Sequence, residues 1–564
     1  MILDIILFVT FSLCNYNDAD AFVIPSTMIR RNAAFHPTTQ PLKLFTTMSN
    51  FTTENTPTKE SSQVNDLLQQ AKSLNEEISK NYIYIYDTSL RDGTQGESVS
   101  VSCEDKLKIA KKLSNDLQVN YIEAGWPGSN PKDIEFFTKS QTVLDDEIKE
   151  KLVAFGSTRR KGISNIEEDK QIMTLIESKA GTICMVAKSH LGQVEDILRT
   201  TDKENLSMIY DSVHYCKQIH KRKVFVDLEH FFDGFIYDKE YVLQCCNVAI
   251  EAGVDGLVLC DTNGGTMPWA IHDMTKEVVD LYGDKAIVGI HCHNDCGMAV
   301  ANSLSAVQAG ATLIQGTING IGERTGNADL CSIIPSLSLH MNYTSSCKNA
   351  LSNITTVSRF VDEVLNRNPN PAAPFVGQSA FAHKGGLHVA AMERDEKSYQ
   401  HIDPTLVGNE KRILISELSG RQNILDKIKQ SGVSFGEETS ERALAILNRV
   451  KSLESIGYTF EGADASVHLM ILHMSKEYCP PFRVLDYSTT VFDFDLDSAS
   501  RVLGRDGAGS GSFKDGKSAK SGARATVLVR AVQLDNKVCD DTAPYTDRLE
   551  VSDGNGKYYT FIYP

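Results

Sequence analysis

Two histidines separated by a single residue, His291 and His293, have the spacing of metal ligands. They lie in the run VGIHCHND, which has the composition of a strand, and residues two apart on a strand point to the same side. Two imidazoles beside a carboxylate suit a divalent ion such as zinc, manganese or cobalt, and magnesium less obviously. Asp92, in the run LRDGTQGE, is our candidate for the carboxylate. The alternative is a pair of histidines hydrogen-bonded in a wet pocket.

Eight short runs rich in β-branched and apolar residues must position these side chains, and helical patterns lie between them. Near-continuous apolar runs are typical of strands buried on both faces. Eight strand–helix units within about 250 residues predict an α/β fold, a (β/α)8 TIM barrel, with an open doubly wound sheet as the alternative. The predicted strands are 82–86, 119–125, 152–158, 182–187, 223–229, 256–262, 286–293 and 312–320.

The ends of these predicted strands are polar. In a barrel of this kind the site lies at the carboxyl ends of the strands. The polar residues at the strand ends or just after them, besides the two histidines, include Arg91, Asp92, Glu123, Arg159, Asp227, Glu229, Thr262, Glu323 and Asn327. We therefore expect one ring of polar groups at one mouth of the barrel.

Composition excludes several classes of protein. The chain has 564 residues, enough for two or three domains, and an ordinary globular balance of 41% hydrophobic and 23% charged residues. A formal charge of −16 without a long basic run argues against nucleic acid as a partner. No apolar stretch reaches the roughly 20 residues that span a bilayer, so no membrane is expected for the mature form. Thirteen cysteines without a CxxC pair are interpreted as free thiols in a reducing compartment.

Residues 1–60 have the composition of a targeting presequence rather than of a folded domain. An apolar stretch of about a dozen residues begins the chain, and the small residues at Ala19–Phe22 suit cleavage by a signal peptidase. Residues 22–53 are rich in Ser and Thr and contain no acidic residue. This order resembles the bipartite presequence that directs proteins to plastids in diatoms and related algae. We expect the mature protein in the plastid stroma; a disordered tail or a misassigned start is the alternative.

Two long signatures resemble the α-isopropylmalate, homocitrate and citramalate synthase family. They are LRDGTQGESVSVSCEDK and VGIHCHNDCGMAVA, and the similarity extends from about residue 82 to the end of the chain. The family joins acetyl-CoA to a 2-oxo acid and hydrolyses the thioester. The runs YIEAGWPGSNPKDIEFF and DLEHFFDGF are most similar to the branch that uses pyruvate and serves isoleucine biosynthesis.

The resemblance also implies roles for individual residues. Asp92, His291 and His293 would bind a divalent metal (manganese, magnesium, zinc or cobalt), with Asn327 completing or supporting the site. Arg91 would bind substrate and stabilise the developing oxyanion, and Arg159, Thr262 and Glu229 would lie near the substrate. Glu323 matches a glutamate of the family that supports the catalytic site from behind the residues in contact with metal and substrate, and His388 and Tyr399 are the family's candidates for proton transfer. The family also implies a homodimer.

The barrel is expected to span residues 81–345. The chain beyond it divides into two further parts. Residues 346–456 are expected to form helical lid subdomains, with a break at NRNPNPAAP and an amphipathic helix in ETSERALAILNRVKSLESIG. Residues 457–564 resemble the first part of the family's α+β regulatory domain, with strands in 483–496 and 523–534 and a disordered loop at 504–522. Because the family's second half of that domain is missing, we expect little feedback control.

Three other functions remain open from the sequence. An isopropylmalate synthase would use the same chemistry on a larger oxo acid. A metal-dependent acyl-CoA lyase or aldolase would share the barrel and the metal motif, although such lyases end soon after the barrel. A binding protein without activity would be expected to lack Arg91, Asp92 or the histidine pair, and all are present.

Overall fold

The computed structural model describes residues 81–392, 394–475 and 478, together with the backbone of four strands between residues 482 and 563. The predicted presequence, residues 1–60, and the greater part of the predicted loop at 504–522 lie outside the described residues. Within the described part, no helix is long and apolar enough to cross a membrane. All described cysteines are free, and all but Cys296 are buried.

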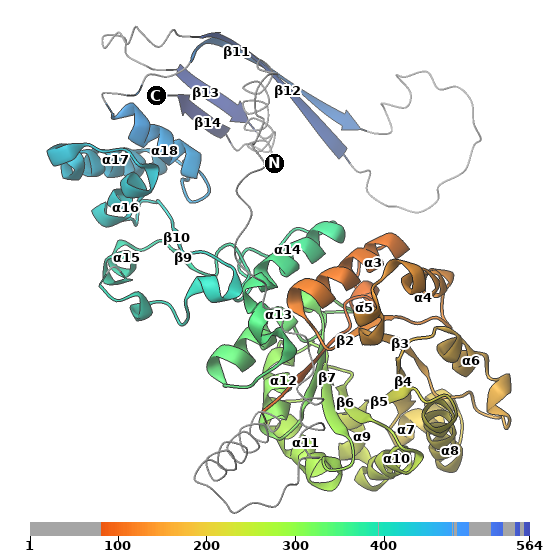
Figure 1. The fold of residues 1–564 in the computed structure, drawn as a ribbon. Coiled ribbons are helices and arrows are strands. Elements are labelled where there is room, and N and C mark those ends of the chain that lie inside the picture. Colours follow the sequence, from red (N-terminus) through yellow and green to blue (C-terminus); the bar gives the residue numbers. More distant parts are fainter. Residues whose placement is uncertain are drawn as a thin grey trace, which may run out of the picture. The chain divides into compact units, whose positions relative to one another are not determined.

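Eight parallel strands close into a barrel in sequence order, as predicted (Figure 1). Each strand hydrogen-bonds to the next, and the last, β8, pairs with the first, β1. The strands are β1 (Tyr84–Asp87), β2 (Tyr121–Gly125), β3 (Leu152–Ser157), β4 (Thr182–Lys188), β5 (Lys223–Glu229), β6 (Gly256–Asp261), β7 (Ile287–Cys292) and β8 (Leu313–Gly316).

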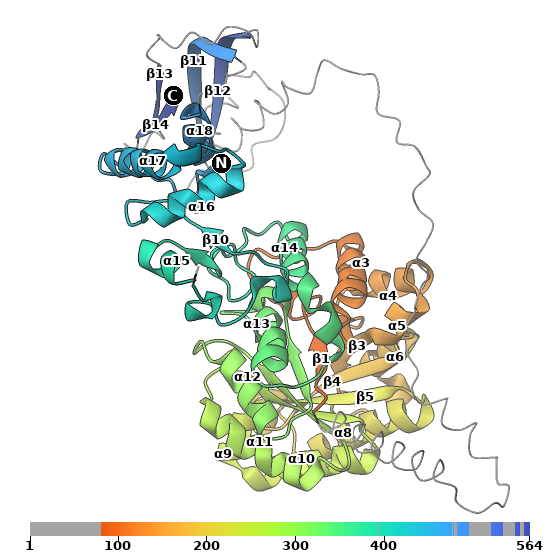
Figure 2. The same cartoon turned by 60° about the vertical axis from the view of Figure 1, so that its left-hand side comes forward.

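Helices surround the outside of the strands (Figure 2). The predicted helix at 104–117 is α3 (Cys103–Lys112) continued by one π turn, and it begins at a capping box formed by Ser102 and Asp105. The predicted helix at 239–253 ends at Gly253, whose φ of 91° only glycine adopts readily. That helix is α10 (Lys239–Ala252), and the others around the barrel are α4 (Pro131–Val143), α5 (Asp146–Lys151), α6 (Lys170–Glu177), α7 (Leu191–Gln193), α8 (Asp202–His214), α9 (Phe231–Tyr237), α11 (Pro268–Tyr282), α12 (Ala299–Gln308) and α13 (Leu330–Pro335).

Side chains alternate along each strand between two apolar cores, one between the strands and the surrounding helices and one inside the barrel. Ile85 of β1 packs outward in the large apolar cluster between strands and helices, whereas Tyr86 packs inward. The ring of Tyr86 meets Phe225 edge to face inside the barrel, with ring centroids 6.0 Å apart. The interior is therefore filled by side chains, and polar residues that share this inward phase must find partners there.

Strand β8 is shorter than predicted. It ends at Gly316, and a 3₁₀ turn at Ile318–Gly320 follows, in which Asn319 has a left-handed φ of 61°. Asn tolerates this conformation better than most residues because its side chain bonds locally. The early end of β8 frees residues 319–328 to form a long loop beside the end of β7.

Helices and short strands make up residues 346–475. Helix α14 (Ile354–Val364) packs with the large cluster through Val357 and Val361. A second, separate apolar cluster joins α16, α17 and α18, among others through Ile424, Leu447 and Val467. The elements are β9 (Ala382–His383), α15 (Gly386–Met392), β10 (Arg412–Ile413), α16 (Arg421–Ser431), α17 (Thr439–Glu454) and α18 (Asp464–His473).

Two antiparallel hairpins follow. Strand β11 (Phe482–Asp495) pairs with β12 (Ser521–Gln533), which confirms the two predicted strands, and β13 (Asp547–Ser552) pairs with β14 (Tyr558–Tyr563). That these strands belong to a partial regulatory domain stays a prediction.

Candidate active site

A tight turn at the end of β1 presents Asp92 to the barrel mouth. The carbonyl of Thr88 accepts the backbone N–H groups of Arg91, Asp92 and Gly93, at 3.1, 2.9 and 3.1 Å. The backbone N–H of Ile318 donates to the hydroxyl of Ser89, so the turn is tied to the loop after β8. The position of Asp92 is thus fixed both by its own turn after β1 and by the loop that follows the neighbouring strand, β8.

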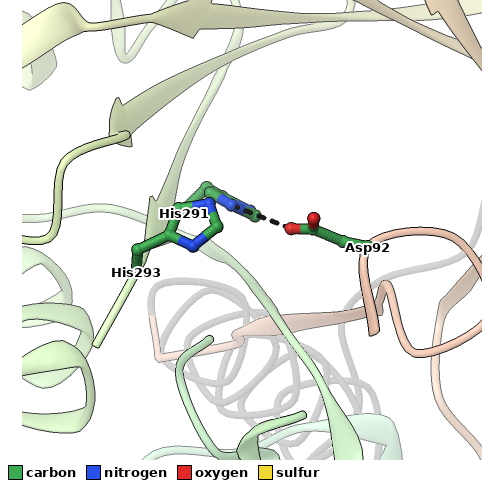
Figure 3. Close-up of side chains that lie close together, drawn as sticks. All are labelled: Asp92, His291 and His293. Atoms are coloured by element: carbon green, nitrogen blue, oxygen red, sulfur yellow. Dashed lines mark ion pairs between the residues drawn. The ribbon is translucent and has the colours of Figure 1, made fainter. Parts of the chain in front are cut away.

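Asp92, His291 and His293 come together as the sequence predicted (Figure 3). One ligand atom of each lies within 4.8 Å of the other two, and all three residues are buried. Nε2 of His291 is 3.3 Å from Oδ2 of Asp92, an ion-pair distance without the geometry of a hydrogen bond. The two imidazole rings meet at 68°, with centroids 5.2 Å apart.

Asn327 joins this group from the loop after β8. It forms an isolated antiparallel bridge with His293, and its Nδ2 donates to the carbonyl of Ile321 at 3.2 Å. Its Oδ1 is buried and has no hydrogen-bond partner among the described residues, and the same is true of Oδ2 of Asp92 and Nδ1 of His293. Buried polar atoms left without partners cost free energy. Two oxygens and one imidazole nitrogen that lack partners at one place fit a divalent metal ion.

The charges of Asp92 and His293 are those that a metal ion requires of its ligands. Burial alone would raise the pKa of Asp92, but the positive charge of Arg91 and the contact with His291 outweigh it and hold that pKa below its usual range. Burial, followed by the neighbouring His291, lowers the pKa of His293 to about 4. Near neutral pH, Asp92 is therefore ionised and His293 is neutral, as ligands must be to bind metal.

Arg91 lies beside Asp92 and is fixed on three sides. Its Nε donates to Oε1 of Glu123 at 2.6 Å, and its Nη1 is 3.3 Å from Oδ1 of Asp92. The guanidinium stacks on the ring of Phe155, 3.8 Å from the centroid. The second oxygen of Glu123 accepts the hydroxyl of Tyr86 at 2.5 Å. Nη2 of Arg91 makes no hydrogen bond to any described residue, so it is the donor available to a substrate oxygen.

Comparison with known proteins places this geometry in a family. A family model described as HMGL-like matches residues 82–361, and one described as homocitrate synthase post-HMGL domain-like matches residues 375–457. The (R)-citramalate synthase of Aquifex aeolicus is 48% identical over 422 residues, which cover 75% of this chain and 76% of that protein. The chain belongs to the citramalate synthase family.

Other relatives differ in how similar they are. The (R)-citramalate synthase of Synechocystis is 43% identical over 72% of this chain and 74% of its own length. The 2-isopropylmalate synthase of Sulfolobus acidocaldarius is 32% identical over 69% of this chain and 95% of its own length. Identity is thus higher to the citramalate synthases of the family.

The remaining predicted residues of the barrel lie at strand ends but already have partners. Oγ1 of Thr262 accepts the backbone N–H of His230 at 2.8 Å, and Glu229 forms an ion pair with Lys188. The guanidinium of Arg159 turns away toward α8, where Nε and Nη1 each donate to a carboxylate at 2.8 Å, those of Asp211 and Glu204. Binding of substrate by Arg159 stays a prediction, and it would require the guanidinium to exchange these partners.

Three further predicted residues are exposed. Glu323 hydrogen-bonds through its side chain to none of the described residues, and only its carbonyl takes part in the turn that leads to Gly326. His388 and Tyr399 stack on each other with ring centroids 4.1 Å apart, which unites the two residues predicted to transfer protons. Neither has a described hydrogen bond or ion pair to the metal-ligand group, so their catalytic role stays a prediction.

Sequence patterns did not identify the hydrogen-bonded layer beneath the metal ligands as part of the site. Glu123 and Asp227 were seen only as polar strand ends, and Gln315 was not singled out. All three are buried inside the barrel. The alternation of side chains along each strand could have identified two of them. Glu123 points into the barrel like Tyr121, and Asp227 points into it like Phe225.

Proposed function

We propose that this chain is an acyltransferase that condenses acetyl-CoA with pyruvate to give (R)-citramalate and free CoA. The observation that carries the proposal is the difference in identity between the two branches of the family. Five (R)-citramalate synthases are 43–48% identical to the chain, whereas three 2-isopropylmalate synthases are 32–34% identical. The inward-facing acid and histidines, together with Arg91, support an enzyme rather than a binding protein.

Asp92, His291, His293 and Asn327 would hold a divalent metal ion, and their nitrogen and oxygen donors suit manganese, zinc or cobalt, and magnesium less. When bound, the ion would act as a Lewis acid toward the keto group of the oxo acid. Nη2 of Arg91 would donate to the keto oxygen as negative charge develops on it, because a fixed donor stabilises that charge without reorganising. Glu123 holds the guanidinium in place for this task.

The reaction balances without an oxidant or reductant. A base takes a proton from the methyl group of acetyl-CoA, and the methyl carbon forms a bond to the keto carbon of pyruvate. The keto oxygen takes up a proton and becomes the hydroxyl of the product. Water then cleaves the thioester, which releases the CoA thiol and leaves a carboxylate. His388 and Tyr399, whose rings stack, are our candidates for moving these protons.

Three wider features belong to the same proposal. We infer that the enzyme is a homodimer, in which the segment with His388 and Tyr399 covers a barrel mouth of its own or of the partner subunit. We infer that it works in the plastid, on the basis of the composition of residues 1–60. Citramalate would then supply isoleucine biosynthesis without threonine.

Release of CoA from acetyl-CoA with a panel of 2-oxo acids tests the substrate. We expect the highest kcat/KM with pyruvate, and a product that co-elutes with (R)-citramalate on a chiral column. The variant His291→Ala is the control for contaminating activity and should release no CoA above background. A higher kcat/KM with 2-oxoisovalerate would assign the chain to the isopropylmalate branch instead.

A further inference from the structure

Gln315 lies beside His291, one of the predicted metal ligands, one residue before the end of strand β8. In the barrel its Cα pairs with His291 of β7 on one side and with Tyr86 of β1 on the other. Its side chain is fully buried and points into the barrel, like that of Leu313 two residues earlier. An amide in this position must satisfy both of its ends, since an unpaired buried amide is costly.

The amide of Gln315 bridges two functional residues. Its Nε2 donates to Oδ1 of Asp227 at 2.9 Å, across the barrel from β8 to β5. Its Oε1 lies 2.9 Å from Nδ1 of His291. Oδ1 of Asp227 is also approached by Sγ of Cys184 at 3.1 Å, so this oxygen accepts from two directions.

These contacts determine which nitrogen of His291 carries the proton. Because Oδ1 of Asp227 accepts, the donor end of the amide must face Asp227, and the carbonyl end must face His291. A carbonyl oxygen only accepts, so Nδ1 of His291 carries a hydrogen. The lone pair of the neutral ring is then on Nε2, and Nε2 is the atom that lies 3.3 Å from Oδ2 of Asp92.

His293 shows the opposite arrangement, since its Nδ1 is the buried atom that lacks a hydrogen-bond partner in the described part of the chain. The two histidines therefore differ in what fixes them: one has a dedicated acceptor behind its ring and the other does not.

We propose that Gln315, held by Asp227, is a positioning residue that fixes His291 in the tautomer and ring orientation that bind metal through Nε2. The inference rests on the metal site of the proposed function and adds its supporting residues. Partners of this kind behind a ligating histidine raise the basicity of the ligand and orient its ring, and their loss costs about 10- to 100-fold in metal affinity.

The test is the affinity of the metal-stripped full chain for Mn²⁺ and Zn²⁺, measured by competition with a chelating dye. Gln315→Met keeps the volume and removes both hydrogen bonds, and it should weaken binding by about 10- to 100-fold. Leu313→Met is the matched control, because it is equally buried on the same strand and contacts neither Asp227 nor His291 through hydrogen bonds; it should bind as the parent does. Gln315→Glu retains an acceptor for Nδ1 and should recover part of the lost affinity.

Thermal unfolding of the metal-free variants separates a loss of positioning from a loss of folding. If Gln315→Met does not fold, Gln315→Asn replaces it, since a side chain one methylene shorter cannot reach both partners. Equal affinities for Gln315→Met and the parent would overturn the inference, and so would an equal loss in Leu313→Met. A parent chain that binds neither ion would instead refute the metal site of the proposed function.

Discussion

Replacing Glu123 by glutamine should uncouple Arg91 from the barrel interior. Glu123 is fully buried, and each of its oxygens has one partner: Oε1 accepts Nε of Arg91 at 2.6 Å, and Oε2 accepts the hydroxyl of Tyr86 at 2.5 Å. Glutamine keeps the volume but has one accepting oxygen and no charge. Either Arg91 or Tyr86 then loses its acceptor, and Asp92 remains as the one carboxylate that contacts the guanidinium.

The size of the effect follows from burial. Removing one partner of a buried ion pair costs about 3–5 kcal/mol, because the other charge is left uncompensated. Glutamine still accepts one hydrogen bond and Asp92 still balances part of the charge, so we expect the lower end, about 3 kcal/mol in the free energy of unfolding. Because Arg91 would shift toward Asp92, kcat should also fall by about 10²- to 10³-fold, the usual effect of losing one oxyanion donor.

Urea unfolding and steady-state CoA release measure the two effects. Glu277→Gln is the matched control, since Glu277 pairs with Lys239 at a half-exposed site between α10 and α11; it should cost less than about 1 kcal/mol and leave kcat unchanged. If Glu123→Gln unfolds at the same urea concentration as the parent and retains kcat, the buried pair does not hold Arg91 and the reasoning is refuted.

Other predictions address the metal, the acid at the end of β1 and the segment beyond the barrel. Asp92→Ala should abolish CoA release while the circular dichroism spectrum remains that of a folded barrel; a variant with parental turnover would exclude Asp92 as a ligand. Burial raises the pKa of Asp87 to about 7. Because the folded state binds this proton more tightly than the unfolded state, its contribution to stability is complete below about pH 4 and is lost as the pH rises to 7. Relative to the parent, Asp87→Asn should therefore gain up to about 4 kcal/mol across that range in pH-dependent urea unfolding, at 1.36 kcal/mol per pKa unit; equal pH profiles would contradict this. His388→Ala should lower kcat far more than it raises the KM for pyruvate or weakens metal binding, and a near-parental kcat would remove His388 from the proton-transfer step.

The barrel could be predicted because its signals are local. Each strand is a short apolar run with a polar end, and the number and spacing of these runs favoured a closed sheet over an open doubly wound one. The histidine pair was equally accessible, since two residues of one strand share a face whatever the rest of the fold does. Asp92 followed because β1 and β7 end at the same mouth.

The interior network could not be predicted in the same way. The hydrogen bond from Gln315 to Asp227 joins residues 88 positions apart and crosses the barrel between strands that are not neighbours. No periodicity indicates which inward polar side chains will meet. Arg159 illustrates a related limit: the end of β3 fixes where its backbone emerges, but Glu204 and Asp211, on one face of α8, determine where its guanidinium points.

The central claim, a metal-dependent condensation at the mouth of this barrel, is tested most directly by titrating metal into the stripped chain while CoA release is followed with pyruvate and acetyl-CoA. The account predicts no turnover without metal and a linear recovery that ends at one divalent ion per chain. It also predicts that His293→Ala shows no such recovery at the same concentrations. Full turnover in chain that elemental analysis shows to be free of metal would contradict the account.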